Sequence, residues 1–430
     1  MSLEVTIDGL GSGGDGIARL EDGRVLFVPG ALPGDRVEVS LGAVRKKVQY
    51  AAVERVLEKS PDRVQSRCSV VPCGGCVFRE LSSSAQAKHK ARKVSENLRR
   101  IAGMDLKDVF VDFLPAPTQW RYRHRVRLHA QWSGESWQLG FFERGSHRLA
   151  RFSGCPVMWP ELERSVQRVA EAVHRLPREA GLIEVRLAFS RVDKRCAAFI
   201  LSKGRIEAFR EDLSWIELSG LSGVEVQTAD TKWRHGNLEL RYDHARAEEF
   251  PLLFEPCMFT QAFPEVNDAL VQAVLRAVRP ADQPRVLELH SGIGNFSIPL
   301  ARAGAVVTSF ESNERSAIFA ARNASGAGVE VDAHPLPDRE ALKFLGGQKV
   351  LLMDPPRTGA REVCEKLKAW ETELERIVYV SCDSATLARD IKALAQNGFR
   401  LISLTSFDMF PETPHVETLA VLSRDLKTNS

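Results

Sequence analysis

The pattern of hydrophobic and polar positions changes in character along the chain. In the first sixty residues, short apolar runs with a two-residue period alternate with breaks rich in Gly and Pro, which predicts a small β-barrel. From about residue 256 onward, apolar strands alternate with amphipathic helices, which indicates a doubly wound parallel sheet. Residues 130–250 contain pieces of both kinds, and the pattern does not predict their order.

The predicted elements divide the chain into an amino-terminal, a central and a carboxy-terminal part, in keeping with roughly 100–200 residues per domain. Barrel strands are expected at residues 24–28, 36–40 and 47–57. Strands of the parallel sheet are expected at residues 285–289, 306–310, 350–353, 377–380, 401–407 and 418–422. Its helices are expected at residues 266–278, 296–303, 314–324, 360–370 and 385–396. We therefore expect a barrel at residues 1–60, a central α+β domain at residues 61–250 and an α/β domain at residues 251–430.

Two segments of the central part are rich in basic residues. A helix is expected at residues 84–101, where Lys and Arg are dense, and a strand at residues 120–129. The two-residue period of that strand places four arginines on one face: Arg121, Arg123, Arg125 and Arg127. Such a face fits an exposed sheet edge protected by charge, and it fits equally well a surface for RNA phosphates and stacked bases.

Composition narrows the class of protein. The net charge of the 430 residues is only +3, so a nucleic-acid surface must come from local clustering of Lys and Arg. No apolar run approaches the roughly 20 residues of a membrane helix, and the first residues lack the pattern of a signal peptide. A cytoplasmic protein without membrane contact is expected, in which the 8 cysteines stay reduced or bind metal.

A nucleotide-type site is expected at the start of the parallel sheet. The strand at residues 285–289 runs into His290, Gly292 and Gly294, and glycines there let a ligand approach the backbone closely. Glu311 ends the next strand, where a carboxylate can accept hydrogen bonds from ribose hydroxyls. The glycines alone would also fit a structural turn. The absence of Gly-Lys-Ser/Thr and of a full GxGxxG motif favours S-adenosylmethionine (SAM) over a phosphate loop or NAD.

Three further positions suggest acid–base and nucleophilic chemistry. Asp354 follows an apolar strand, which places it at the carboxyl edge of the sheet. Cys382 follows another strand just before a helix, a position that predicts a lowered thiol pKa. His415 and Glu417 precede the last strand and are candidate acid–base groups. A thiolate that adds to carbon 6 of an unpaired uracil makes carbon 5 reactive toward a methyl sulfonium, and a base must then remove the carbon 5 proton.

A cluster of cysteines lies in the central part. Cys68, Cys73 and Cys76 fall within nine positions, and Cys155 stands in a Gly-Cys-Pro segment. Four thiolates can hold zinc or an iron–sulfur cluster, and their spacing does not choose between the two.

With these residues in view, the chain resembles the bacterial RNA uracil-5 methyltransferases, especially those that carry an amino-terminal TRAM domain and modify 23S ribosomal RNA. The resemblance extends over essentially the whole chain, and residues 27–35 look like part of the TRAM barrel. Ser381-Cys382-Asp383 matches the nucleophile motif of the family, and His415-Val416-Glu417 matches its general-base motif. The resemblance therefore implies that Glu417, rather than His415, is the base.

The resemblance also implies ligands for two cofactors. The family residues that contact SAM correspond to Gln261, Asn295, Glu311, Asp332 and Asp354, and we expect His290 and Gly292 of the glycine loop to bind the cofactor with them. The four ligands of a [4Fe-4S] cluster correspond to Cys68, Cys73, Cys76 and Cys155. The chain departs from the family pattern at His290-Ser291, at Phe263 and at Asp383-Ser384.

The resemblance implies RNA as the partner of a monomeric enzyme, with 23S ribosomal RNA as the expected substrate and transfer RNA as the alternative. Cytosine methylation is disfavoured because the Asp354-Pro-Pro-Arg357 segment has no second cysteine. A radical enzyme is disfavoured because Cys68 and Cys73 are too widely spaced for the usual radical motif. A catalytically silent RNA-binding or assembly factor with the same fold is the alternative from another class of protein.

Overall fold

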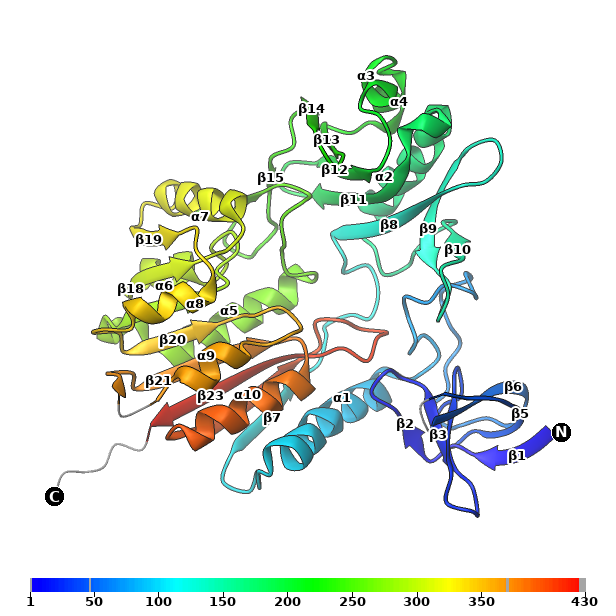
Figure 1. Cartoon of the computed structure of the whole chain (residues 1–430), viewed down its shortest axis with the longest axis horizontal. Coiled ribbons are helices and arrows are strands. Elements are labelled where there is room, and N and C mark those ends of the chain that lie inside the picture. The colour runs from blue at the N-terminus through cyan, green and yellow to red at the C-terminus, as the bar shows by residue number, and fades with distance from the viewer. Residues whose placement is uncertain (1, 46–47, 369–370, 425–430) are drawn as a thin grey trace.

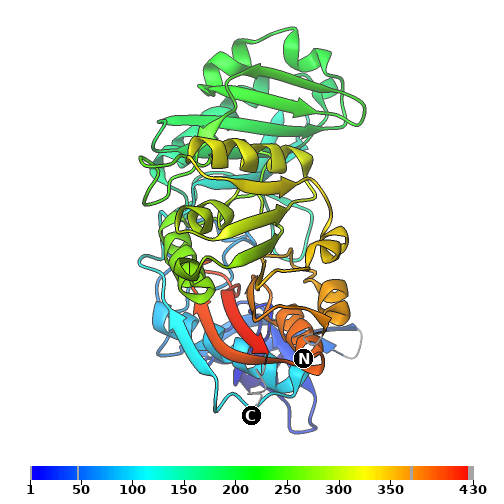
Figure 2. The ribbon, with the colours of Figure 1, turned by 90° about the vertical axis from the view of Figure 1, so that its left-hand side faces the viewer.

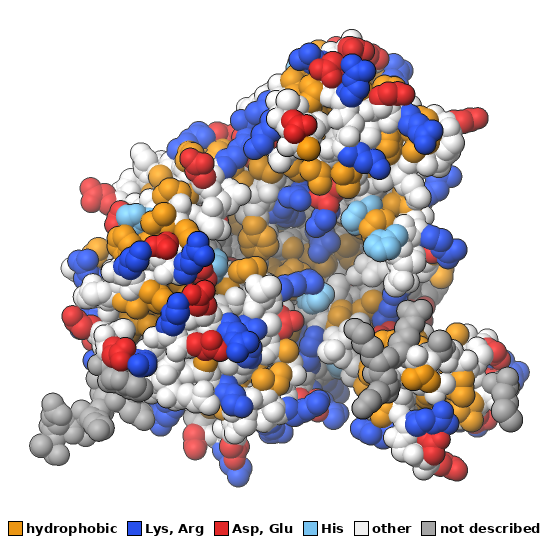
Figure 3. Space-filling model, in the orientation of Figure 1, with side chains coloured by type: hydrophobic (Ala, Val, Ile, Leu, Met, Phe, Trp, Pro, Cys, Tyr) orange, Lys and Arg blue, Asp and Glu red, His pale blue; other side chains and the backbone are white. Residues whose placement is uncertain are grey.

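The computed structural model describes residues 2–45, 48–368 and 371–424. An amino-terminal barrel, a central domain and a carboxy-terminal α/β domain are arranged around a hollow (Figures 1 and 3). Lys and Arg side chains gather on the walls of that hollow (Figure 3). Within the described ranges, no helix has both the length and the apolar character that crossing a membrane requires.

The amino-terminal strands form the predicted barrel. They are β1 (Ser2–Thr6), β2 (Gly9–Leu10), β3 (Gly16–Arg19), β4 (Val25–Val28), β5 (Arg36–Arg45) and β6 (Val48–Glu58), in the order β1-β5-β6-β4-β3-β2. Alternate residues of these strands, such as Leu26, Val28, Val37 and Val39, fill a core of their own. The barrel strands predicted from the two-residue period are confirmed to within a few residues at most ends.

The central domain is a sheet covered by helices. Its strands follow the order β10 (Leu149–Arg151), β9 (Trp137–Phe142), β8 (Arg125–Trp132), β11 (Leu182–Ser190), β12 (Arg195–Ser202), β13 (Gly223–Gln227) and β14 (Lys232–Gly236). The helices are α2 (Pro160–Ala172), α3 (Glu207–Arg210) and α4 (Ser214–Ser219), and a short pair, β15 (Leu240–Arg241) and β16 (Leu253–Phe254), leads out of the domain.

The strand predicted at residues 120–129 begins later than expected. Arg121 adopts a left-handed φ of 55°, and β8 starts at Arg125. Because β8 pairs with both β9 and β11, the interpretation of a sheet edge is wrong. Arg125 donates to the carbonyl of Met258 at 2.7 Å, and Arg127 pairs with buried Glu184. These two arginines are therefore engaged with the protein itself, and RNA contact by this face stays a prediction.

The carboxy-terminal sheet follows the order β19 (Val331–His334), β18 (Val306–Phe310), β17 (Arg285–Leu289), β20 (Val350–Met353), β21 (Arg376–Ser381), β23 (Glu417–Arg424), β22 (Phe399–Phe407) and β7 (Phe110–Leu114). The prediction of an entirely parallel sheet is wrong at one strand, because β23 runs antiparallel to both of its neighbours. β7 and β19 were not predicted.

Helices cover both faces of this sheet. They are α5 (Pro264–Val278), α6 (Ser297–Arg302), α7 (Glu314–Gly326), α8 (Asp338–Ala341), α9 (Arg361–Lys366) and α10 (Ser384–Gln396). Figure 2 shows α9 and α10, in orange, on the side of the sheet opposite to α5, in green. Residues 369–370 of the helix predicted at 360–370 lie outside the described residues. The helix predicted at 84–101 is α1 (Ser83–Asn97) followed by a wider turn, Leu98–Ala102, and it packs beside α10.

Candidate active site

The loop after β17 forms one wall of a pocket. His290, Gly292 and Gly294 all have positive φ values, of 61°, 57° and 94°. No described atom lies within 4 Å of the place where a side chain would begin at Gly292, so the loop leaves open space there. The residues that line the pocket are Tyr242, Phe259, Thr260, Gln261, His290, Ser291, Gly292, Ile293, Asn295, Phe296 and Asp354.

Hydrogen bonds join four of the predicted cofactor residues in two pairs. Glu311 accepts from the backbone N–H of Gly292 at 3.0 Å and from that of Asn313 at 2.7 Å, which ties the end of β18 to the glycine loop. The Gln261 side chain donates to Asp354 Oδ2 at 3.2 Å. The Gln261 carbonyl accepts from the Tyr242 hydroxyl at 3.2 Å and lies 3.0 Å from His124 Nε2. Gln261 and Asp354 therefore face the same small space.

The remaining cofactor predictions differ in how well they fit this pocket. Asn295 lines it, and its amide forms a reciprocal pair with Asn267 at 2.8 and 3.0 Å. Asp332 is exposed on β19, opposite Thr308, and lies 3.0 Å from His334 Nε2. It is not among the lining residues. Asp338, whose carboxylate lies 3.6 Å from His290 Nε2, was not predicted because it stands in a polar segment without a motif.

Strand pairing brings Cys382 and Glu417 together. Ser381 on β21 pairs with Thr418 on β23, so the next residues, Cys382 and Glu417, stand opposite each other where the two strands end. Asp383 caps α10 and accepts from the backbone N–H groups of Ala385 and Thr386 at 3.0 and 2.9 Å. The Cys382 thiol is therefore held between a strand end and a capped helix, next to a carboxyl group that is 35 residues away in the chain.

The electrostatics of Cys382 differ from the prediction. Burial and the neighbouring Glu417 and Asp354 carboxylates raise the pKa of the thiol to about 12, although Arg357 opposes this shift. The prediction of a lowered pKa is therefore wrong for the protein without ligands, because burial and two negative neighbours outweigh the helix. Burial likewise raises the pKa of Asp354 to about 7 and raises that of Glu417 well above the usual carboxyl range.

Asp354 lies between the pocket and Cys382. It lines the pocket with Gln261 and Gly292, and its charge acts on both Cys382 and Glu417. Glu417 is only 2% exposed, and its Oε1 has no hydrogen-bond partner among the described residues. A thiol, an unpartnered carboxyl group and a ligand pocket thus share one edge of the sheet, as nucleophilic catalysis with a general base requires. His415 lies farther out, near Arg357 at 3.4 Å, and its pKa is lowered to about 4 by burial and by the neighbouring cations.

The four clustered cysteines also meet. Cys68, Cys73, Cys76 and Cys155 line one small pocket, and Arg79 donates to the carbonyls of Val70, Cys73 and Cys76 in the loop that carries three of them. Burial and the neighbouring thiols raise the pKa of Cys76 to about 12 and that of Cys155 to about 11. In the described part of the chain, no group of three or more His, Cys, Asp or Glu side chains converges as it would around one metal ion. Of the other cysteines, Cys196 and Cys364 are buried.

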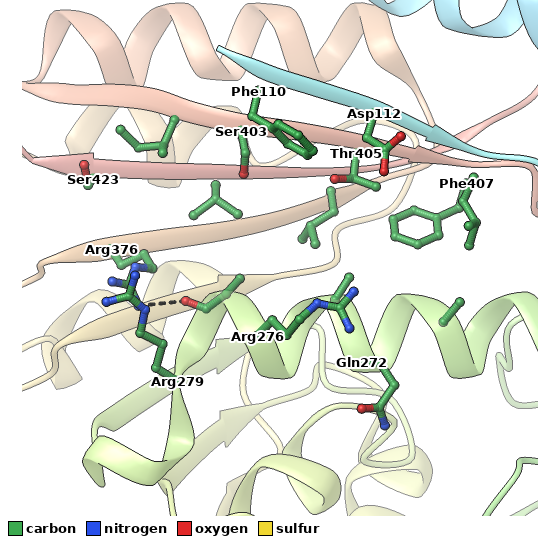
Figure 4. A pocket seen from close by; sticks show the side chains of 17 residues that line it. Phe110, Asp112, Gln272, Arg276, Arg279, Arg376, Ser403, Thr405, Phe407 and Ser423 are labelled. Carbon is green, nitrogen blue, oxygen red and sulfur yellow. Dashed lines mark hydrogen bonds between the residues drawn. The ribbon is translucent and has the colours of Figure 1, made fainter. Parts of the chain in front are cut away.

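A separate groove of about 770 Å³ lies away from all these residues, between α5 and the face of β23, β22 and β7 (Figure 4). Its walls are mostly apolar, with Arg276, Arg279 and Arg376 at one side (Figure 4). None of the predicted site residues lines it.

Comparison with known proteins gives consistent matches. The family model described as TRAM domain matches residues 2–53, and the one described as tRNA (Uracil-5-)-methyltransferase matches residues 343–425. Proteins named 23S rRNA (uracil(1939)-C(5))-methyltransferase are similar over nearly their whole length. The one from Halomonas elongata is 35% identical over 97% of this chain and 89% of its own. The one from Methylococcus capsulatus is 33% identical over 97% and 96%.

A solved structure shares the fold. The crystal structure of Pyrococcus abyssi tRNA (uracil-54, C5)-methyltransferase in complex with S-adenosyl-L-homocysteine superposes with a TM-score of 0.75. The match covers 97% of this chain and 99% of that one, at 24% identity.

Proposed function

Because the chain belongs to the family of RNA uracil-5 methyltransferases, we propose that it transfers a methyl group from SAM to carbon 5 of a uridine in RNA, with Cys382 as nucleophile and Glu417 as general base. The observation that carries this proposal is the apposition of Cys382 and Glu417 at the ends of β21 and β23, with Asp354 between them and the glycine-loop pocket.

The residues of the pocket suit an adenosine-containing donor. Glu311, held by the N–H groups of Gly292 and Asn313, has a second lone pair on each oxygen for ribose hydroxyls. Asn295, Gln261 and His290 offer further polar groups around the same space. Asp332, on the neighbouring strand β19, completes the proposed set. When bound, SAM would supply a cationic methyl donor, and a positive charge in this pocket would offset the carboxylates that disfavour the Cys382 thiolate.

The residues of the chain then act in sequence. The Cys382 thiol first loses its proton to solvent. The sulfur then bonds to carbon 6 of a flipped-out uracil, and the electron pair of the ring double bond moves toward the carbon 4 oxygen, which activates carbon 5 for methylation. After methyl transfer, Glu417 accepts the carbon 5 proton. The electrons of that C–H bond restore the ring double bond, and the bond between carbon 6 and sulfur breaks, which returns Cys382. Burial suits Glu417 to this task because a carboxyl group with a raised pKa is a stronger base.

We further propose that the four cysteines hold a [4Fe-4S] cluster. Each thiolate of such a cluster binds a different iron, so the sulfurs need not converge as they do around a single ion. A pocket lined by four cysteines, on a loop that Arg79 holds through three carbonyls, fits this group better than a structural role for free thiols. When bound, the cluster would cross-link the loop at residues 68–76 to the segment around Cys155.

The proposed substrate is 23S ribosomal RNA in the cytoplasm. The relatives that align with this chain over nearly the full length of both proteins are named as methyltransferases of 23S rRNA. The test is a map of 5-methyluridine in total RNA from cells with and without the protein, complemented by wild type or by Cys382→Ala. We expect one or more 23S positions to lose the methyl group and to regain it only with wild type. If 5-methyluridine is instead lost from transfer RNA, then transfer RNA is the substrate. If Cys382→Ala fully restores the modification, a catalytically silent binding factor is favoured.

A further inference from the structure

One face of α1 holds the segment that leads into Glu417. Gln86, Lys90, Lys93 and Asn97 recur at intervals of four, three and four residues, which places them on one side of the helix. Gln86 and Lys90 are buried, whereas Lys88 and Arg92 on other faces are exposed. One face of this basic helix is therefore turned inward and contacts the rest of the protein.

The first two residues of this face, Gln86 and Lys90, form hydrogen bonds with residues 408–412. The ammonium group of Lys90 donates to Asp408 Oδ1 at 2.5 Å and to the Phe410 carbonyl at 2.9 Å, and both side chains of the ion pair are almost fully buried. The Gln86 side chain donates to Glu412 Oε1 at 3.1 Å and accepts from the Glu412 N–H at 3.0 Å. Glu412 has a left-handed φ of 66°, a conformation that persists only where the surroundings impose it.

Lys93 joins three parts of the chain. Its ammonium group donates to the carbonyl of Pro414, three residues before Glu417, at 3.1 Å. It also donates to the carbonyl of Ser12, in the barrel loop at residues 11–15, at 3.1 Å. One turn further on, Asn97 donates to Ser384 Oγ at 2.8 Å, two residues after Cys382. The helix face thus reaches the base-bearing and the nucleophile-bearing segments together.

The barrel loop is seated firmly against this region. A side chain beginning at Gly14 would lie 2.8 Å from Val77 and 3.0 Å from Phe78, so only glycine allows the approach. The Phe78 N–H donates to the Glu412 carbonyl at 2.9 Å. A shift of the barrel loop at Gly14 would therefore act through Phe78 on the loop that leads into Glu417. Asp15 pairs with Arg144 of the central domain at 2.6 Å and anchors the other side of the same loop.

The position of Glu417 depends on this scaffold. The loop leaves β22 at Phe407 and returns to the sheet at Glu417, where those two residues pair. One Glu417 oxygen has no hydrogen-bond partner among the described residues, so the backbone of the loop that ends at Glu417 contributes to fixing its place. We propose that Lys93 is a positioning residue that aligns Glu417 for removal of the carbon 5 proton while the barrel loop at residues 11–15 stays docked. This inference rests on the proposed function.

The step at issue is the last one in the reaction. Glu417 takes the carbon 5 proton, the C–H electron pair forms the double bond to carbon 6, and Cys382 leaves as the thiolate. Attack by Cys382 and methyl transfer come earlier and do not use Glu417 as a base. A misplaced Glu417 therefore lets a methylated, covalent RNA–protein adduct form and slows only its release.

The experiment compares Lys93→Met with Lys93→Arg, which keeps a donor, and with Lys88→Met, an exposed lysine on the same helix. Each variant receives SAM with an RNA containing ordinary uridine or 5-fluorouridine. For Lys93→Met we expect kcat to fall roughly tenfold to a hundredfold, as for a misplaced catalytic group. KM for RNA and the rate of adduct formation with 5-fluorouridine should stay within about threefold of wild type, and the adduct with ordinary uridine should accumulate. Lys93→Arg should recover part of kcat, and Lys88→Met should behave as wild type.

A second pair of variants tests the barrel. Gly14→Ala and Gly23→Ala replace glycines of nearly equal φ, 84° and 83°, but no described atom lies within 4 Å of a side chain beginning at Gly23. The strain of the backbone is thus matched and only the docking differs. We expect Gly14→Ala alone to reproduce the slow release of Lys93→Met.

Several results would overturn the inference. They are unchanged kcat in Lys93→Met, an equal loss of 5-fluorouridine adduct formation, a raised KM with unchanged kcat, or equal behaviour of the two glycine variants. A wild-type protein that forms no adduct with 5-fluorouridine would instead remove the proposed function itself.

Discussion

One buried space holds the thiol of Cys382 and the carboxyl groups of Asp354 and Glu417, and the negative charge of the carboxylates raises the pKa of the thiol. Arg357 is the cation that opposes this effect on Cys382 and Glu417. In the protein without ligands the thiol stays protonated at neutral pH, because its pKa is raised to about 12. In the proposed mechanism, this arrangement holds the nucleophile Cys382 in its less reactive thiol form, and each carboxylate disfavours the thiolate.

Replacing Asp354 should therefore activate the free thiol. Asp354→Asn removes a negative neighbour that is ionised at pH 9, since its pKa is about 7. The thiol pKa falls, and each unit of decrease gives about tenfold more thiolate at that pH. Alkylation of the peptide containing Cys382, followed by mass spectrometry without SAM, should be at least severalfold faster than in wild type. Buried Cys364 in the same digest is the control, and an unchanged or slower rate at Cys382 would contradict this view of the charges.

Replacing Glu417 should separate the two halves of the reaction. Glu417→Gln keeps the shape but cannot accept the carbon 5 proton, so release should slow by about 100-fold or more, within the usual range for a general base. Attack by Cys382 remains, and a covalent adduct with ordinary uridine should build up on a denaturing gel. If Glu417→Gln turns over at the wild-type rate, another group is the base.

At the scale of the elements, the apolar strands of the α/β domain could be predicted because four or more consecutive buried residues leave an unambiguous pattern, as in β17 and β20. β7 and β19 escaped because most of their residues are partly or fully exposed. The direction of β23 could not be predicted, because an apolar run carries no information on whether a strand is parallel or antiparallel to its neighbours. The apposition of Cys382 and Glu417 depends on that antiparallel pairing, so their motifs could be found from sequence, but their proximity could not.

The scaffold role of α1 was also hidden. From sequence it was only a helix dense in Lys and Arg, and the structure shows that Lys90 is fully buried against Asp408. Lys90→Met should leave a buried carboxylate without its cation and cost roughly 3–5 kcal/mol of unfolding free energy. Urea unfolding measures this cost. The double variant Lys90→Met/Asp408→Leu should recover a large part of it, whereas an equally unstable double variant would show that the ion pair is not the cause.

The cysteine loop makes a prediction of its own at this scale. Protein purified without oxygen should be brown, with broad visible absorption, and Cys155→Ser should reduce both the colour and the iron content. Replacing partly buried Cys257, which does not line the pocket of the four cysteines, in the same way should change neither. A colourless wild-type protein that contains only zinc would contradict the proposed [4Fe-4S] cluster.

At the scale of the whole molecule, buried charges connect the central domain to the α/β domain. Arg315 on α7 pairs with Glu225 on β13 at 2.6 Å and with Glu255, and Arg234 on β14 pairs with the same two carboxylates. Both glutamates are less than 5% exposed. We therefore expect this network to contribute to the orientation of the two domains around the hollow.

Arg315→Ala should therefore destabilise the protein by about 3 kcal/mol, because Arg234 alone must then compensate two buried carboxylates. Arg322→Ala on the same helix is the control, since Arg322 pairs with the more exposed Glu239 and should cost at most about 1 kcal/mol. Scanning calorimetry compares the two variants, and equal losses would mean that the network does not join the domains.

The most direct test of the whole account is covalent capture of the substrate. Wild-type protein with SAM and a 23S fragment containing 5-fluorouridine should form one stable adduct, because fluorine cannot be removed as a proton. Mass spectrometry of the digested adduct should find a methylated fluorouridine on the peptide that contains Cys382. An adduct on a different residue, or methyl transfer to uridine by Cys382→Ala, would contradict the account.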